Sequence, residues 1–344
     1  MNTKLRILHA PEDVGGHAYG LSRAERELGL RSDVAVLGEG RFGYGADLRY
    51  DPERTPWSRL ASRVRLLRHA LRDYDVIHFN FGQSFVPLQA AGIGFNDLPL
   101  IKRAGKTVLV TFQGCDVRPA ASCFCRRASC RREDRCRQPN ARRFIRDADR
   151  IFHLNPDLGQ WLPGSRFLAY ANVDPWAIAP TPPLGEHDEI VVMHAPTDRD
   201  VKGTAYVQAA VDELRNEGLA IRLVLIEGVP RSEVLRRLCE ADVVIDQMLI
   251  GWYGGFAVEA MALAKPVVCH IGEDNPFGYE LPIVRASPPT LVERLRELAA
   301  DRDARARIGL ASRTFVERHH DPRAIAAEVL EGLLDEQPGA DVRG

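Results

Sequence analysis

Short apolar runs alternate with amphipathic stretches along the first half of the chain. The first run, at 5–10, is followed by Gly15-Gly16 and by a helical pattern through Leu21, Ala24 and Leu28. Further apolar runs of strand length lie at 33–37, 76–79, 108–112 and 151–154, and 57–71 has the period of a helix. This alternation predicts a parallel sheet covered by helices, as in a Rossmann-like domain.

A second alternation of the same kind follows a proline-rich stretch. We predict strands at 190–194, 221–226, 243–246 and 266–271, and helices at 204–217, 232–240, 256–264, about 289–299, 302–318 and 322–335. The proline-rich stretch at 174–188 breaks both patterns and indicates a hinge. The predicted units are therefore an amino-terminal domain over 1–173, the hinge, a carboxy-terminal domain over 189–321, and a final helix and tail over 322–344.

The composition is typical of an enzyme-sized globular protein. The 344 residues are 45% hydrophobic and 27% charged, with a formal net charge of −1, which argues against a disordered or generally nucleic-acid-binding protein. No export signal is visible at the start, and nowhere do about 18 apolar residues run uninterrupted. We therefore expect a cytoplasmic protein, whose contact with a membrane would be peripheral, at its inner face.

The most informative segment is 251–268, GWYGGFAVEAMALAKPVV. It places Gly254-Gly255 between a predicted strand and a helix that begins at Phe256, so backbone N–H groups at the helix start can hold a diphosphate. Glu259 lies about one turn further on, where its carboxylate can accept hydrogen bonds from ribose hydroxyls. Spacing alone is equally compatible with a tight turn followed by a solvated glutamate.

This segment resembles the nucleotide-sugar signature of the GT-B retaining glycosyltransferases of family 4, also called glycosyl transferases group 1. The family's form is Glu-x-Phe-Gly, four residues, then Glu-Ala-x-Ala-x-Gly-x-Pro-Val-Val. The positions in register are Tyr253, Gly254, Glu259, Ala260, Ala262, Pro266, Val267 and Val268. Three further stretches resemble family motifs in the expected order: Gly15-Gly16 in the amino-terminal loop, Asn172-Val173-Asp174 between the domains, and Lys202-Gly203 after the first carboxy-terminal strand.

The resemblance implies a GT-B fold, in which two Rossmann-like, doubly wound domains face each other across a cleft. It also implies a hexosyltransferase-like enzyme that transfers sugar with retention from a nucleoside-diphosphate sugar and needs no metal for catalysis. The amino-terminal domain would bind the acceptor and the carboxy-terminal domain the donor. The implied donor-binding residues are Gly15, Gly16, His17, Gly254, Gly255, Phe256 and Glu259, and the implied catalytic residues are Lys202, Arg199, Gln113 and Asp116.

Several of these assignments have alternatives. Lys202 and Arg199 carry charges suited to a diphosphate, but they also fit a solvated basic turn. His17 either reaches the cleft or is a bystander. Asp116, in a segment that resembles the family's His-Gly-x-Asp, either binds acceptor hydroxyls or pairs with Arg118.

Three positions expected in the cleft depart from the family pattern. Gly251 replaces the first glutamate of the signature, Pro196 replaces the usual basic residue and leaves Arg199 as its nearest substitute, and Gln113 stands where many relatives have histidine. These departures leave two other functions open. One is a catalytically silent GT-B module that binds a nucleotide or a polyanion, and the other is an enzyme similar to the sugar-nucleotide epimerases.

A segment rich in cysteine and arginine covers about 115–150. Its cysteines are Cys115, Cys123, Cys125, Cys130 and Cys136, five of the seven in the chain. Four thiolates can close a structural zinc site, but the spacing matches no common zinc or iron–sulfur motif, so free or pairing thiols are the alternative.

The same segment is strongly basic. Between 126 and 150 it has ten arginines and four acidic residues, which can attract an anionic acceptor or an acidic lipid surface or form a solvated helix face. Its scarce aromatic residues, Phe124 and Phe144, argue against a nucleic-acid partner.

Overall fold

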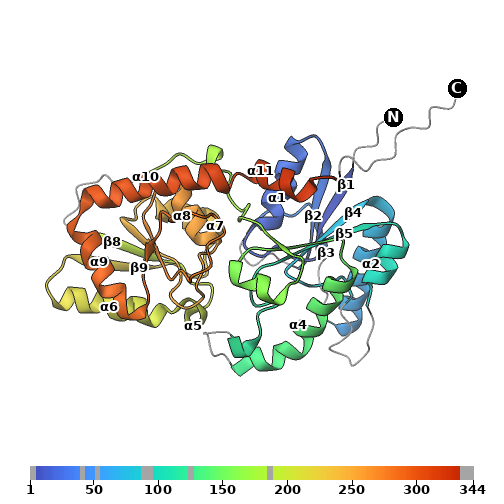
Figure 1. Cartoon of the computed structure of the whole chain (residues 1–344), viewed down its shortest axis with the longest axis horizontal. Coiled ribbons are helices and arrows are strands. Elements are labelled where there is room, and N and C mark those ends of the chain that lie inside the picture. Colours follow the sequence, from blue (N-terminus) through green and yellow to red (C-terminus); the bar gives the residue numbers. More distant parts are fainter. Residues whose placement is uncertain are drawn as a thin grey trace.

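The computed structural model describes residues 5–38, 43–50, 55–86, 96–122, 128–183 and 189–333, with backbone alone at 128–136. It contains two separate parallel sheets, each flanked by helices (Figure 1). The predicted pair of doubly wound domains is therefore confirmed. Among the described residues, no helix combines the length and apolar character needed to cross a membrane.

The amino-terminal sheet has seven strands in the order β3-β2-β1-β4-β5-β6-β7, and every neighbouring pair is parallel. The strands are β1 (Arg6–Ala10), β2 (Arg31–Leu37), β3 (Leu48–Tyr50), β4 (Val76–Asn80), β5 (Thr107–Phe112), β6 (Arg150–His153) and β7 (Arg166–Phe167). The central strands β1, β4 and β5 are almost wholly buried. This burial on both faces explains why their sequences are continuous apolar runs.

Helices cover both faces of this sheet. They are α1 (His17–Glu27), α2 (Pro56–Asp73), α3 (Leu98–Arg103) and α4 (Ala128–Asp147). Successive residues of a strand belong to two different hydrophobic cores. Leu8 of β1 packs with α2, α3 and α4 on one face of the sheet, and its neighbour Ile7 packs with α1 on the other. Successive strand side chains point to opposite faces, so one apolar run serves both cores.

The carboxy-terminal sheet has five parallel strands in the order β12-β11-β10-β8-β9. They are β8 (Ile190–His194), β9 (Ile221–Leu225), β10 (Val243–Ile245), β11 (Val267–Cys269) and β12 (Val284–Arg285). The helices are α5 (Arg199–Lys202), α6 (Thr204–Asn216), α7 (Arg231–Leu238), α8 (Gly255–Ala262), α9 (Leu291–Ala300) and α10 (Arg302–His319). β10 ends one residue before the predicted strand end, so Asp246 directly follows it.

The last described helix, α11 (Pro322–Leu330), belongs to the core of the amino-terminal domain. Its residues Ile325, Ala326, Val329 and Leu330 are buried with Leu21 and Ala24 of α1, and the two helices lie side by side in Figure 1. The chain therefore crosses between the two domains a second time, after α10.

Candidate active site

The glycine-rich loop of the amino-terminal domain meets the start of α8 in the other domain. A side chain on Gly255 would place its Cβ 3.0 Å from Nδ2 of Asn172 and 3.6 Å from the carbonyl oxygen of Gly15. Nδ2 of Asn172 also donates a hydrogen bond to the Gly255 carbonyl at 3.1 Å. The structure thus brings together three motifs that lie far apart in the sequence, and a side chain at 255 would fit only if Asn172 shifted.

Lys202 and the backbone N–H of Gly254 converge on one carboxylate. The ammonium of Lys202 donates to Oδ1 of Asp246 at 2.7 Å, and the Gly254 N–H donates to Oδ2 at 2.6 Å. The side chain of Lys202 is 12% exposed and that of Asp246 is not exposed at all. Lys202 and the Gly254 N–H, which together contact one buried carboxylate, are called the anion site below.

Sequence reasoning missed Asp246. A signal was available, because Asp246 directly follows a strand, and open α/β sheets place their ligands at the carboxyl ends of strands.

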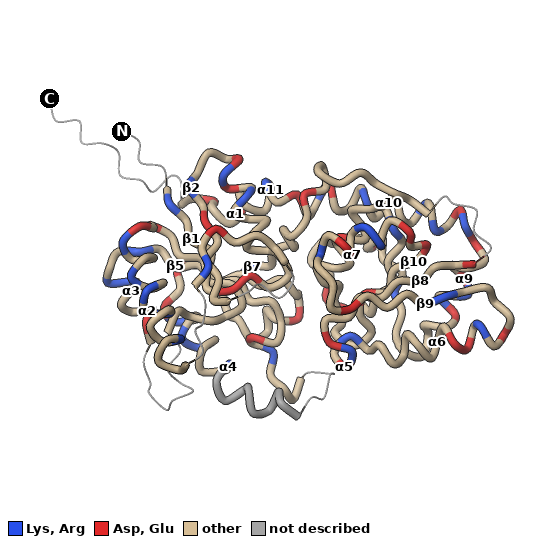
Figure 2. Tube along the Cα trace, turned by 180° about the vertical axis from the view of Figure 1, so that it is seen from behind, with Lys and Arg blue, Asp and Glu red and all other residues tan. Residues whose placement is uncertain are grey.

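Arg199 lies one turn before Lys202, in the short helix α5. Its Nε donates to Oε1 of Glu227 at 2.9 Å, and the two side chains are 54% and 36% exposed. Figure 2 shows acidic residues beside the basic ones at α5. An exposed pair of this kind contributes about 0–1 kcal/mol to the stability of the fold. Arg199 therefore lies at the surface, where the alternative of a solvated basic turn would place it.

Glu259 is almost fully buried and carries two hydrogen bonds from side chains. The hydroxyl of Tyr44, from the amino-terminal domain, donates to its Oε1 at 3.0 Å, and Nε of Arg231 donates to the same oxygen at 2.5 Å. Burial raises the pKa of Glu259, while the charge and hydrogen bond of Arg231 lower it. Neither Tyr44 nor Arg231 belongs to a recognisable motif, so only the fold reveals them.

A pocket of about 260 Å³ opens between the domains beside this cluster. Its lining comes from α1, the segment 171–178, α7 and α11, and includes Asn172 and Arg231. Phe256, predicted to contact the donor, is partly buried against the core of the carboxy-terminal domain.

Gly251, which stands in place of the first signature glutamate, has a φ of 81°. This left-handed conformation favours glycine over any residue with a side chain. A glutamate at position 251 would therefore be strained in this backbone conformation.

His17, predicted to contact the donor, lies at the start of α1. The ring is completely buried, and its Nδ1 accepts a hydrogen bond from the backbone N–H of Ala171 at 3.1 Å. Burial lowers the pKa of His17 to about 3, so the ring is neutral at physiological pH. His17 therefore joins the start of α1 to the interdomain segment.

The segment after β5 forms a turn that is braced from within. The carboxylate of Asp116 accepts hydrogen bonds from the backbone N–H groups of Gln113 and Gly114, the latter at 2.7 Å. Burial raises the pKa of Asp116 to about 6. Arg118 donates two hydrogen bonds of 2.8 Å to Asp157. In this structure the carboxylate of Asp116 thus braces its own turn, and the charge of Arg118 lowers its pKa against the effect of burial.

Gln113, in contrast, has an unused donor. Its Nε2 is buried and has no hydrogen-bond partner in the described part of the chain. Buried polar atoms are nearly always paired, so this amide is free to donate to a bound group.

The proposed zinc ligands cannot be compared with the structure. Cys123 and Cys125 lie outside the described residues, and so do the side chains of Cys130 and Cys136 in α4. Cys115 is half-buried directly after Gly114. The metal site stays a prediction.

Solved structures that resemble this one include glycosyltransferases. Sucrose-phosphate synthase from Thermosynechococcus elongatus has a TM-score of 0.64 at 16% identity, over 97% of this chain and 99% of that one. WaaG, a glycosyltransferase involved in lipopolysaccharide biosynthesis, has a TM-score of 0.58 at 13% identity, over 95% and 100%. The catalytic domain of starch synthase IV from Arabidopsis thaliana has a TM-score of 0.54 at 10% identity, over 94% and 100%.

At these identities the similarity defines the fold, and the chain has the GT-B fold of these enzymes. A comparison with protein-family models finds no match, and neither does a comparison with curated protein sequences.

Proposed function

We propose that the protein is a retaining glycosyltransferase that moves a sugar from a nucleoside-diphosphate sugar to an acceptor hydroxyl without a catalytic metal. The observation that carries the proposal is the convergence of Lys202 and the Gly254 N–H on one anion, beside a buried glutamate at the domain interface. The catalytic domain of starch synthase IV was solved with ADP, and a complex of TarM, another GT-B structure, contains UDP. A nucleoside diphosphate is therefore the ligand class to test first.

The anion site would act on the leaving group. In the reaction the bond between the sugar's anomeric carbon and the diphosphate oxygen breaks, and the acceptor oxygen bonds to that carbon from the same face. The acceptor's proton passes to the departing diphosphate. Negative charge grows on the diphosphate during this step, so the ammonium of Lys202 and the fixed Gly254 N–H lower the barrier.

The other residues would bind and orient. Glu259 would hold the ribose hydroxyls, since a buried carboxylate is a strong hydrogen-bond acceptor. The unused amide donor of Gln113 would meet a hydroxyl of the transferred sugar. Asp116 would shape the turn that presents Gln113, because it holds the backbone N–H groups of that turn.

A second candidate is the silent binding module, and one observation favours it. Gly251 stands in place of the first signature glutamate, and its left-handed φ of 81° disfavours any side chain there. The site therefore lacks a carboxylate that the resemblance implies for a transferase.

The decisive experiment combines binding with turnover. A thermal-shift screen with UDP, GDP, ADP and TDP should identify the nucleotide, because a ligand that binds the folded state raises the unfolding midpoint. Sugar forms of that nucleotide are then incubated with acceptor mixtures, and products are analysed by mass spectrometry. Steady release of nucleoside diphosphate with a glycosylated product supports transfer. Binding with neither release nor a new sugar nucleotide identifies the silent module. A new sugar nucleotide with the donor's mass but a different chromatographic retention identifies an epimerase.

Two substitutions assign the roles. Glu259→Ala should lower nucleotide affinity roughly 10- to 100-fold, because it removes a charged acceptor from buried hydroxyls. Lys202→Ala should lower turnover more than binding, since its charge matters most as the leaving group forms. Exposed ion-paired residues elsewhere provide matched controls, Glu240→Ala and Lys102→Ala. If Glu259→Ala binds the nucleotide as wild type does, Glu259 does not contact the ribose.

A further inference from the structure

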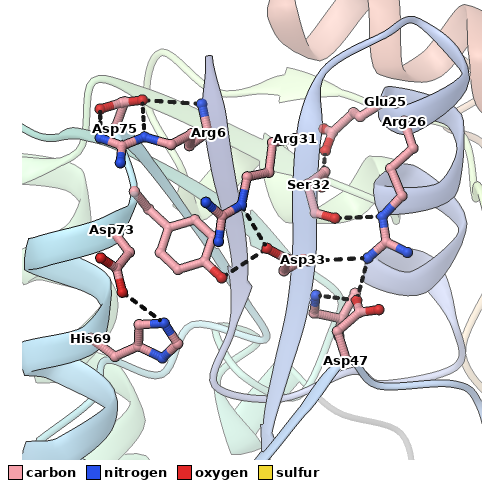
Figure 3. Close-up of polar contacts among 12 residues, drawn as sticks. Arg6, Glu25, Arg26, Arg31, Ser32, Asp33, Asp47, His69, Asp73 and Asp75 are labelled. Atoms are coloured by element: carbon pink, nitrogen blue, oxygen red, sulfur yellow. Dashed lines mark hydrogen bonds and ion pairs between the residues drawn. The ribbon is translucent and has the colours of Figure 1, made fainter. Parts of the chain in front are cut away.

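The segment that ends at β3 is anchored on the amino-terminal domain close to the site. Oδ2 of Asp47 accepts hydrogen bonds from the backbone N–H of Val34 at 2.8 Å and from Arg26 of α1 at 2.5 Å, and its own N–H donates to the Val34 carbonyl. Figure 3 shows Asp47 held between α1 and β2. Tyr44 lies three residues before this anchor.

Two glycines let the segment lie flat on the start of α1. A Cβ on Gly16 would come 2.1 Å from Cε1 of Tyr44, and a Cβ on Gly45 would come 2.4 Å from the ring of Tyr19. No side chain fits at either contact. The ring of Tyr44 therefore rests directly on the glycine loop that faces the carboxy-terminal domain.

From this position Tyr44 reaches the other domain. Its hydroxyl donates to Oε1 of Glu259 at 3.0 Å, and the guanidinium of Arg231 lies 5.0 Å from the centre of its ring, where it is attracted to the π face. Nε of Arg231 donates to the same Oε1 at 2.5 Å. The three side chains thus form one cluster across the domain interface, in which Glu259 is buried and Tyr44 and Arg231 are partly buried.

The two partners of Glu259 have different chemistry. A buried carboxylate needs a counter-charge and hydrogen-bond donors. Arg231 supplies the charge from Glu259's own domain, and it can stay in place when a nucleotide binds. Tyr44 supplies a hydroxyl donor from the opposite domain, and burial raises its pKa, which keeps that hydroxyl protonated. A ribose hydroxyl offers the same kind of donor.

We propose that Tyr44 occupies the ribose-binding side of Glu259 in the nucleotide-free protein, and that the donor's ribose displaces its hydroxyl. This inference rests on the proposed function of Glu259. Tyr44 acts as a gate, whose movement away from Glu259 must precede or accompany binding, and Arg231 is a positioning residue that orients Glu259. The measured affinity for a ribonucleotide is then reduced by the fraction of molecules in which Tyr44 is closed.

The test compares Tyr44→Phe with wild type by calorimetry. The substitution keeps the ring on Gly16 and removes only the competing hydroxyl. Because a hydrogen bond to a charged group is lost from the closed state alone, the affinity for a nucleoside diphosphate should rise roughly three- to tenfold. Tyr19→Phe is the matched control, since its ring packs on the same segment. The probes are UDP, GDP, ADP and TDP, and the 2′,3′-dideoxy form of each nucleotide that binds.

The dideoxy probe separates ribose competition from a general effect on the loop. It has no hydroxyls for Glu259, so Tyr44→Phe should leave its affinity unchanged. Equal or weaker binding of the ribonucleotide to Tyr44→Phe overturns the gate while leaving the proposed function intact, and so does an equal gain with both probes. If neither protein binds any of the nucleotides, the proposed function fails and the gate fails with it.

Discussion

Replacing Asp246 with asparagine tests whether the protein's own carboxylate competes with the donor's diphosphate. Asp246 lies 2.7 Å from the ammonium of Lys202, and the two side chains are 0% and 12% exposed. Removing one partner of a fully buried pair costs about 3–5 kcal/mol. Lys202 retains some contact with water, and asparagine can still accept from the Gly254 N–H. We therefore expect the free energy of unfolding to fall by about 2–3 kcal/mol.

The same substitution should strengthen nucleotide binding. Lys202 then carries an uncompensated charge that a diphosphate can neutralise, and we expect the affinity to rise about tenfold, or ~1.4 kcal/mol. Denaturant unfolding without ligand measures the first effect, and calorimetry with the nucleoside diphosphate bound by wild type measures the second.

The control for this substitution is Asp212→Asn, which removes a carboxylate from an exposed pair on α6. It should change neither quantity by more than about 0.5 kcal/mol. Weaker nucleotide binding by a folded Asp246→Asn protein would refute the reasoning. It would mean that Asp246 holds the site in shape and does not compete with the ligand.

Three further predictions address the fold and the cysteine-rich segment. Ala264→Gly should change the free energy of unfolding by less than about 1 kcal/mol, because relief of the strain at φ 58° is offset by the added entropy of the unfolded chain and the loss of a fully buried methyl group. A loss of about 2 kcal/mol or more in denaturant unfolding would contradict this. The unfolding midpoint should fall as the pH drops from about 6.5 to 4: burial lowers the pKa of His153, His194 and His320 to about 4, so the unfolded state binds more protons there. Burial raises the pKa of Asp13 and Asp116 to about 6, so these two groups offset only part of this loss. A flat pH profile would count against the assignment of low pKa values to the buried histidines. Elemental analysis should find about one zinc per chain, held by four among Cys115, Cys123, Cys125, Cys130 and Cys136; protein without zinc or iron, purified without chelator and with all its thiols titratable, would exclude the metal site.

The amino-acid sequence by itself determined the architecture. The apolar runs at 5–10, 76–79 and 108–112 became β1, β4 and β5, because burial on both faces of a parallel sheet demands continuous apolar residues. The strands that the pattern missed are short. β3 (Leu48–Tyr50) is half-exposed and β7 (Arg166–Phe167) has two residues, too few for a periodic signal.

For the site, the sequence determined which residues carry suitable chemistry, and the tertiary structure decided what each one meets. The glycine pair, Lys202 and Glu259 stand out in linear motifs, because diphosphate and ribose binding need backbone N–H groups, a cation and a carboxylate at a helix start. Their partners are distant in the chain: Lys202 and Asp246 are 44 residues apart, and Tyr44 and Glu259 are 215 apart.

No local pattern encodes such pairings. Hydrophobic periodicity reports which face of an element is buried, whereas the choice of a charged or hydroxyl partner depends on which segments the packed domains bring within about 3 Å. Tyr44 reaches Glu259 because two glycines let its segment lie on α1, and His17 is buried because α1 meets the segment at Ala171. The contact of Tyr44 with Glu259 exists only once the two domains have packed together, and the burial of His17 follows from packing within the amino-terminal domain.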